Sequence, residues 1–109
     1  MIDSGYRRLA VHTAMMNYRF VPERLEEACS IWQEEVLEVA RGHEGFVRMQ
    51  LYSRPTGEAL AIGTWQSRDN AEAFMQTGVF KRLLARLEGL TAEEPKPSRW
   101  ALRSFAEAE

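Results

Sequence analysis

Two strand-like segments joined by a short turn constrain the fold of this chain more than any other feature. Residues 46–53, FVRMQLYS, alternate between two faces, and residues 59–65, ALAIGTW, combine small and β-branched side chains before a tryptophan. The connection RPTGE contains the proline and glycine that favour a turn. The sequence therefore predicts an antiparallel β-hairpin in the middle of the chain. One face of its first strand would carry Val47, Met49 and Leu51.

A helix is predicted before the hairpin. Pro22 suits a first helical turn, and three early glutamates favour the positive end of the helix dipole. Apolar side chains then recur at helical spacing, so the helix should run roughly from Pro22 to Arg41, and Gly42 should end it in a left-handed conformation. The apolar side of this helix would consist of Leu25, Cys29, Trp32, Val36 and Val39.

A second helix, in two pieces, is predicted after the hairpin. Ser67 can cap its first piece, which should run from Arg68 to about Gln76. Gly78 then interrupts the helical pattern, which resumes in VFKRLLARLEGL, so a kink or break is expected there. The apolar side of the second piece would consist of Phe80, Leu83, Leu84 and Leu87.

Two further strands are predicted near the ends of the chain. LAVHTAMMNYRF, residues 9–20, is apolar without a helical stripe, and RWALRSF, residues 99–105, alternates. TAEEPKPS, residues 91–98, is interpreted as a charged linker because it contains two prolines. The order β-α-β-β-α-β is typical of the ferredoxin-like α+β fold, a four-stranded antiparallel sheet with its helices on one face.

Such a sheet has one bare face, and this predicts a partner. Because the predicted strands are apolar on both faces, the bare face needs a cover, and a second copy of the chain is the least demanding one. We therefore expect a homodimer with Trp100 at the interface; the alternative is a monomer with a half-exposed sheet. A length of 109 residues fits a single domain, 1–109, whose ends, 1–6 and 106–109, should be flexible.

Composition excludes several classes of protein. Lys and Arg number 14 against 16 Asp and Glu, so there is no basic excess for binding nucleic acid. No apolar run approaches about 18 residues, so no membrane partner is predicted. The single cysteine, Cys29, predicts no disulfide and should be buried and inert, and with only two histidines we expect no metal site. Because the lone cysteine fits a reducing compartment and no leader-like segment opens the sequence, we expect a cytoplasmic protein.

The residues around Trp65 predict a cavity. Ala61, Gly63 and Trp65 share one face of their strand, so two nearly absent side chains leave a space that the indole bounds. The first strand offers a similar face, made of Ala10, His12, Ala14, Met16 and Tyr18. Together the two faces predict one apolar cavity with a few polar groups between sheet and helices, as is usual for small-molecule sites.

Residues 22–87 resemble the antibiotic biosynthesis monooxygenase family of dimeric α+β-barrel proteins. The resemblance rests on VPERLEE at the start of the first helix, on HEGF where the family usually shows Pro-Gly-aromatic, and on TWQSRDNAEAFMQTGVFK. In the last segment Trp65 and Ser67 are similar to the family's Trp-x-Ser junction between strand and helix. The resemblance implies that the sheets of two copies form a barrel. Similar members include quinol and anthrone monooxygenases, which use no metal or flavin, and haem-degrading monooxygenases.

The chain departs from the family pattern in its histidines. Relatives often carry histidines on the second helix, where this chain has Phe74 and Val79, and haem-degrading members carry a haem-ligating histidine at the position that resembles Leu84. The family's cavity asparagine corresponds to Met16, while Asn17 is one residue off and therefore on the opposite face of the strand. These departures disfavour haem degradation, with His12 as the remaining alternative haem ligand.

The resemblance implies a cofactor-free monooxygenase that uses dioxygen to oxidise a quinol, an anthrone or a similar activated aromatic. Trp65 would stack on the aromatic ring and donate a hydrogen bond. His12 would act as the base, because the ordinary pKa of histidine lies near neutral pH. Arg48 or Arg103, if directed inward, would stabilise the developing anion. The substrate-binding residues would be Met16, Trp32, Ala61, Gly63 and Phe74.

Each candidate also has a simpler interpretation. Trp65 and Trp32 suit core packing equally well, and a single histidine on a strand, such as His12, is often a surface residue. His43 lies in a predicted turn, where we expect it to be solvated. A non-catalytic protein that holds an apolar ligand in the same cavity is therefore the second functional hypothesis, and a haem-binding protein is the third.

Overall fold

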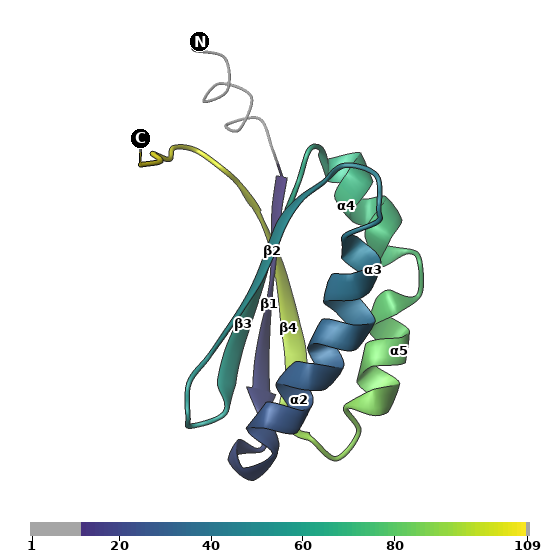
Figure 1. Cartoon of the computed structure of the whole chain (residues 1–109), viewed down its shortest axis with the longest axis vertical. Helices are drawn as coiled ribbons and strands as arrows, with labels where there is room; N and C mark the ends of the chain where they lie inside the picture. Colours follow the sequence, from purple (N-terminus) through teal and green to yellow (C-terminus); the bar gives the residue numbers. More distant parts are fainter. Residues whose placement is uncertain (1–11, 109) are drawn as a thin grey trace.

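The sheet has the predicted ferredoxin-like arrangement. The computed structural model describes residues 12–108, in which four antiparallel strands have the order β2-β3-β1-β4. The helices all lie on one side of the sheet and leave its other face bare (Figure 1). The strands are β1 (His12–Phe20), β2 (Phe46–Ser53), β3 (Glu58–Trp65) and β4 (Thr91–Ala101). The predicted residues 9–11 of the first strand lie outside the described part of the chain.

The first helical region is continuous but contains three kinds of helix. A 3-10 turn, Pro22–Arg24, leads into α2 (Leu25–Trp32), a π-helical segment, Gln33–Leu37, and α3 (Glu38–Ala40). In the π turn the backbone N–H of Glu38 donates a hydrogen bond to the carbonyl of Gln33, five residues earlier. The predicted apolar side was partly wrong, because Leu25, Cys29 and Val39 are only half-buried. The buried residues are Ala28, Ile31, Trp32, Val36 and Ala40.

The left-handed glycine after this helix is Gly45 rather than the predicted Gly42. Gly45 has φ 81°, and a β-carbon there would collide with the side chain of Asn70. The carbonyl of Gly45 accepts a hydrogen bond of 2.8 Å from the backbone N–H of Gln66. The residue with a left-handed conformation therefore lies where the turn meets the end of β3. This is three residues after Gly42, the position that helix capping alone suggested.

The second helical region breaks at Gly78, as predicted. Ser67 caps α4 (Arg68–Met75) by accepting a hydrogen bond from the backbone N–H of Asn70, and Gly78, at φ 87°, separates it from α5 (Val79–Arg86). The prediction for Leu84 was wrong, because its side chain is 47% exposed. The buried side of α5 and of the residue that follows it has a spacing of four residues, which turns Leu84 away from the sheet. Its members are Val79, Leu83 and Leu87.

The last strand begins much earlier than predicted. β4 starts at Thr91, so the segment interpreted as a linker is most of the strand, while residues 102–108 have no regular structure. Among the described strands β4 pairs only with β1, so it forms an edge of the sheet, where proline is tolerated because one side of the strand needs no hydrogen-bond donors. Pro97 accordingly lies opposite Met16 without ending the pairing.

An irregularity in β2 changes the predicted faces of the hairpin. Phe46 lies opposite Trp65, yet Arg48 lies opposite Thr64, so Val47 is an extra residue in the ladder. The shift places Phe46 on the helix-covered face with Met49 and Leu51, and leaves Val47 38% exposed. The alternation prediction was therefore correct for Met49 and Leu51 and wrong for Val47. The bulge sits beside Trp65 and brings a second aromatic ring against it.

Candidate functional site

A cavity of about 220 Å³ lies between the sheet and the helices. Apart from His12, six residues were predicted as catalytic or substrate-binding residues of such a cavity, and all six lie in its wall. They are Met16, Trp32, Ala61, Gly63, Trp65 and Phe74. Their roles in function stay predictions. Its other lining residues are Ala14, Met15, Val36, Met49, Ala71, Met75, Phe80, Pro97, Ser98 and Arg99. The wall is thus apolar except at the edge formed by β4.

Trp65 closes one end of this cavity. Its indole is 2% exposed and packs against Phe74, with ring centroids 4.9 Å apart, and against Phe46 at 5.6 Å. Gly63, on the same face of β3, lies opposite Ala14 of β1 and Met49 of β2, and a β-carbon on Gly63 would come within 2.9 Å of Cε of Met49. A β-carbon on Gly63 would lie 3.3 Å from Nε1 of Trp65. The indole nitrogen therefore sits beside Gly63, in a part of the wall that the Met49 side chain also lines.

Trp32 lines the cavity from the helical side, at the junction of α2 with the π-helical segment. Val36, inside that segment, lies in the same wall. Single π turns in helices are frequent at functional sites because they displace side chains from regular helical positions. The Trp32 indole nitrogen is buried and has no hydrogen-bond partner among the described residues.

Tyr18 is a second buried polar group near this wall. Its hydroxyl also has no partner with hydrogen-bond geometry in the described chain, although the indole N–H of Trp32 acts on it electrostatically. Burial raises the pKa of Tyr18 well above its ordinary value, and the Trp32 N–H opposes this only in part. The phenol therefore stays protonated near neutral pH, where it can donate a hydrogen bond but cannot act as a base.

His12 lies beside the cavity rather than in its wall. It is the cross-strand neighbour of Trp65 and precedes the lining residue Ala14 by two positions on the same face of β1. Burial lowers its pKa from the ordinary value, the positive charges of Arg99 and Arg68 lower it further, and the carboxylate of Glu72 opposes them. His12 is therefore neutral near pH 7, and its Nε2 is buried with no partner among the described residues.

The arginine in the cavity wall is Arg99, rather than the predicted Arg48 or Arg103. Arg48 lies opposite Thr64 on the bare face of the sheet, and Arg103 is exposed in the segment after β4; neither lines the cavity. Arg99 lies opposite Ala14, on the helix-covered face of β4. The sequence showed that Arg99 and Trp100 lie on opposite faces of the last strand. Because the predicted start of this strand was wrong, its register with β1 was unknown, and the sequence could not show that Arg99 lies opposite Ala14.

His43 was expected to be solvated, and this was wrong. Its ring packs edge-on against Trp65, with centroids 5.9 Å apart, and against Phe74 at 5.6 Å. Its Nδ1 is buried and has no hydrogen-bond partner among the described residues. The turn between α3 and β2 places His43 behind the two aromatic rings that line the cavity. A turn residue gives no sequence signal for such packing, because its neighbours come from β3 and α4.

Cys29 is half-buried on α2 and is a poor nucleophile. Burial raises the pKa of its thiol, the nearby charge of Glu26 raises it further, and a hydrogen bond with Ser53 lowers it only in part. The thiol is therefore protonated near neutral pH. Within residues 12–108 no three His, Cys, Asp or Glu side chains gather as they would around a metal ion. In the same part of the chain no helix is long and apolar enough to cross a membrane.

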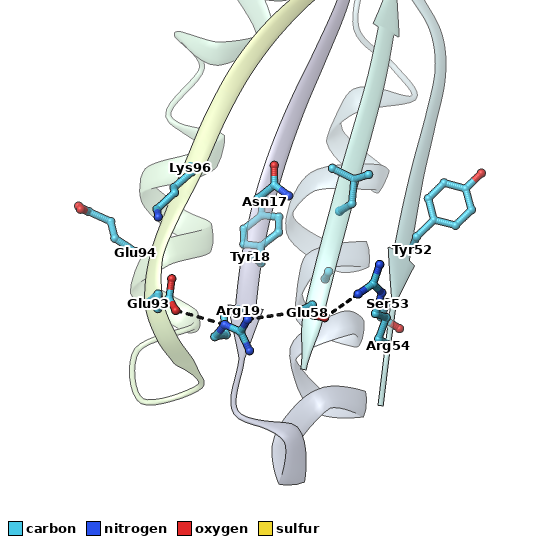
Figure 2. Close-up of a pocket in the computed structure, with 12 residues that line it drawn as sticks. Asn17, Tyr18, Arg19, Tyr52, Ser53, Arg54, Glu58, Glu93, Glu94 and Lys96 are labelled. Atoms are coloured by element: carbon cyan, nitrogen blue, oxygen red, sulfur yellow. Dashed lines mark hydrogen bonds and ion pairs between the residues drawn. The ribbon is translucent and has the colours of Figure 1, made fainter. Parts of the chain in front are cut away.

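A larger hollow, of about 610 Å³, lies on the bare face of the sheet (Figure 2). Its charges are three basic and three acidic side chains, so they balance. A row of ion pairs runs across neighbouring strands of the sheet. Arg19 contacts Glu93 at 3.2 Å and Glu58 at 2.9 Å, and Glu58 in turn contacts Arg54 at 3.1 Å. Because most of its charged groups already have partners, this open hollow is less suited to a small ligand than the apolar cavity is.

The fold and the apolar cavity define a small ferredoxin-like domain with a ligand-sized space between its sheet and its helices. The sequence model of the antibiotic biosynthesis monooxygenase family matches residues 11–86, and the chain belongs to this family. No curated protein matches the sequence.

Solved structures share the fold at low sequence identity. A protein of unknown function from Nitrosomonas europaea is 10% identical with a TM-score of 0.77, covering 94% of this chain and 98% of its own. A conserved protein from Methanosarcina mazei is 13% identical with a TM-score of 0.75, covering 92% and 98%. A cofactor-independent oxygenase from Streptomyces nogalater is 18% identical with a TM-score of 0.70, covering 88% and 96%. Because these sequence identities are low, the similarity to the solved structures shows a shared fold alone.

Proposed function

We propose that this protein is a monooxygenase that oxidises a quinol, an anthrone or a similarly activated aromatic in the cavity beside Trp65, without a cofactor. Membership of the monooxygenase family and the fold shared with a cofactor-independent oxygenase support this proposal. The observation that carries it is the cavity itself, an apolar space of about 220 Å³ bounded by aromatic rings. Its walls suit a flat, apolar molecule, and dioxygen is small and apolar enough to enter with it.

The chemistry follows from the substrate. An anthrone that loses a proton from its CH₂ group becomes an electron-rich anion, which can transfer one electron to dioxygen. The resulting substrate radical and superoxide combine to form a C–O bond, and the peroxide anion takes up the proton. Loss of water then breaks the O–O bond, the second hydrogen of the CH₂ group leaves with it, and a carbonyl remains. One oxygen atom enters the product, and the other leaves as water.

The protein would supply placement, a base and a hydrogen-bond donor. His12, neutral near pH 7 beside the cavity, is the group with a suitable pKa to accept the proton. Trp65 would stack on the ring, and its Nε1, beside Gly63 in the cavity wall, would donate to the developing oxyanion. Excluding water from an apolar site strengthens both contributions.

The test is dioxygen uptake by purified, metal-free protein with a panel of anthrones, naphthoquinols and catechols. Trp65→Phe should lose most of the uptake above the uncatalysed rate. Trp100→Phe is the matched control, because Trp100 is 55% exposed and does not line the cavity, so its uptake should equal that of the wild type. Absence of uptake with every member of the panel would refute the oxygenase proposal.

A non-catalytic ligand-binding protein is the second candidate. The observation that favours it is the wall of the cavity, where the described lining residues include no histidine and no carboxylate. Tight binding of a naphthoquinol without oxygen uptake, measured by calorimetry under air, would support this candidate over the oxygenase. The haem hypothesis loses support, because Leu84, the position that resembles the family's haem ligand, is exposed and does not line the cavity.

We also propose that the bare face of the sheet is covered by a second copy of the chain. Apolar side chains of this face include Leu60, Ile62 and Trp100, which the strand register places on the side of the sheet away from the helices. Their partial exposure on an unpaired face is typical of an interface between subunits. A two-fold dimer needs only one self-complementary surface, which the shared face provides.

A further inference from the structure

One positively charged side chain lies in the wall of an otherwise apolar cavity. Among the described lining residues, Arg99 alone carries a charge. Its side chain is 45% exposed, so it stands at the rim, where β4 forms the edge of the sheet. A guanidinium in this position can reach a ligand in the cavity while it keeps part of its hydration.

The charges around Arg99 leave an excess of one positive unit. Arg99 contacts Oε2 of Glu72 at 2.8 Å, and Arg68 contacts the same oxygen at 3.0 Å. These two hydrogen bonds, with Arg68 the stronger influence, lower the pKa of the Glu72 carboxyl, so it is ionised near neutral pH. One carboxylate shared by two guanidinium groups cannot neutralise both, and Arg99 keeps donors for a second anion.

The neighbouring His12 adds no negative charge to this rim. Its Nε2 is buried and has no partner among the described residues, and the same two arginines disfavour its protonated form. The rim therefore presents a cation and a neutral imidazole side by side, and beyond them lies the aromatic floor made by Trp65 and Phe74.

We propose that the cavity takes a flat aromatic of two or three rings that carries an anionic oxygen, and that Arg99 binds this oxygen at the rim. The inference rests on the proposed function, since it names the substrate class of that same cavity. A volume of about 220 Å³ is below the roughly 300 Å³ at which drug-sized sites begin, which limits the number of rings. The anionic oxygen is a carboxylate or an ionised phenol, since both offer the acceptor that a guanidinium binds.

The test is calorimetric titration with 2-naphthoate, its neutral analogue 2-naphthamide, and 2-naphthol above and below the pH of its ionisation. The first two differ in charge but little in shape, and neither reduces dioxygen, so binding is measured without turnover. Wild-type protein should bind 2-naphthoate roughly tenfold more tightly than the amide, since a half-exposed charged hydrogen bond lies at the lower end of its range. Tighter binding of 2-naphthol only when it is ionised would identify phenolate as an accepted form of the anion.

Variants separate direct contact from the general field. Arg99→Gln should abolish the preference for the charged ligand while it retains amide binding, and Arg99→Lys should keep part of the preference. Arg103→Gln is the matched control, because Arg103 is exposed four residues further along the chain and does not line the cavity, and its preference should stay within about twofold of the wild type. Thermal unfolding of each variant checks that the fold is intact.

Three results would overturn the inference: equal binding of naphthoate and naphthamide, binding of neither, or a preference that survives Arg99→Gln. The oxygenase proposal fails separately. If oxygen uptake is absent throughout the substrate panel while the Arg99-dependent preference holds, the cavity is a binding site for aromatic anions and the chemistry alone is refuted.

Discussion

Filling the cavity with a larger side chain should stabilise the protein, whereas the same enlargement in a packed core would destabilise it. Ala61 is 8% exposed and lies in the cavity wall, between Met16 of β1 and Leu51 of β2. Ala61→Leu adds three carbons to space that is already empty. At about 0.8 kcal/mol per buried carbon the gain is at most about 2.4 kcal/mol. Ordering the new side chain costs about 0.5–1 kcal/mol, so the net stabilisation should be about 1–2 kcal/mol.

Ala28→Leu is the matched control for this prediction. Ala28 is 0% exposed in α2 and does not line the cavity, so the same added carbons should overpack the core and destabilise it by about 1–3 kcal/mol. The measurement is the free energy of unfolding from urea titrations at equal protein concentration, which matters if the protein dimerises. Ala61→Leu should also lose binding of 2-naphthamide. Equal destabilisation by both substitutions would show that the space beside Ala61 is already filled in solution.

Three further predictions concern the remaining features. Light scattering should give twice the chain mass of 12.6 kDa at micromolar protein, and Ile62→Lys, on the bare face of the sheet, should shift it to the monomer mass. The folded-state pKa of His12 lies below the ordinary value of 6.5, so its contribution to stability is present above that pH and lost as the pH falls below it. Urea titrations from pH 7.5 to about 5 should show this loss relative to His12→Gln, and parallel curves would contradict it. Gly78→Ala should destabilise by about 1 kcal/mol because φ is 87° there, whereas Gly42→Ala, with open space around it and no positive φ, should be neutral or stabilising in the same assay.

The parts of the fold that depend on local periodicity were predictable from the sequence. The hairpin, the break at Gly78 and the alternating face of Ala61, Gly63 and Trp65 each follow from residues that are neighbours in the chain. The start of β4 does not. Two prolines and a run of charges argue against a strand locally, and only the position of β4 at the edge of the sheet makes them acceptable.

The same distinction separates the predicted cavity residues from the missed ones. Trp65 and Met16 were recognisable from their faces on single strands. Arg99 and His43 acquire their places through pairing and packing between distant segments: Arg99 through its register with Ala14, and His43 through its contacts with Trp65 and Phe74. The bulge at Val47 had the same effect on Phe46, because an extra residue in one strand is defined only by its partner strand.

The division of the cavity between core and edge has a consequence for how its ligand preference is set. Trp65 and Phe74 are almost completely buried, so a substitution in this part of the wall also changes the stability of the domain. Arg99, by contrast, stands half-exposed on an edge strand, and the ion pair that it forms with Glu72 at the surface contributes little to folding. A change at Arg99 alters the charge offered to the ligand while the apolar walls stay in place. In the proposed binding mode the aromatic floor would select a flat molecule in every variant that folds, and the edge strand would vary independently to select the group which that molecule carries.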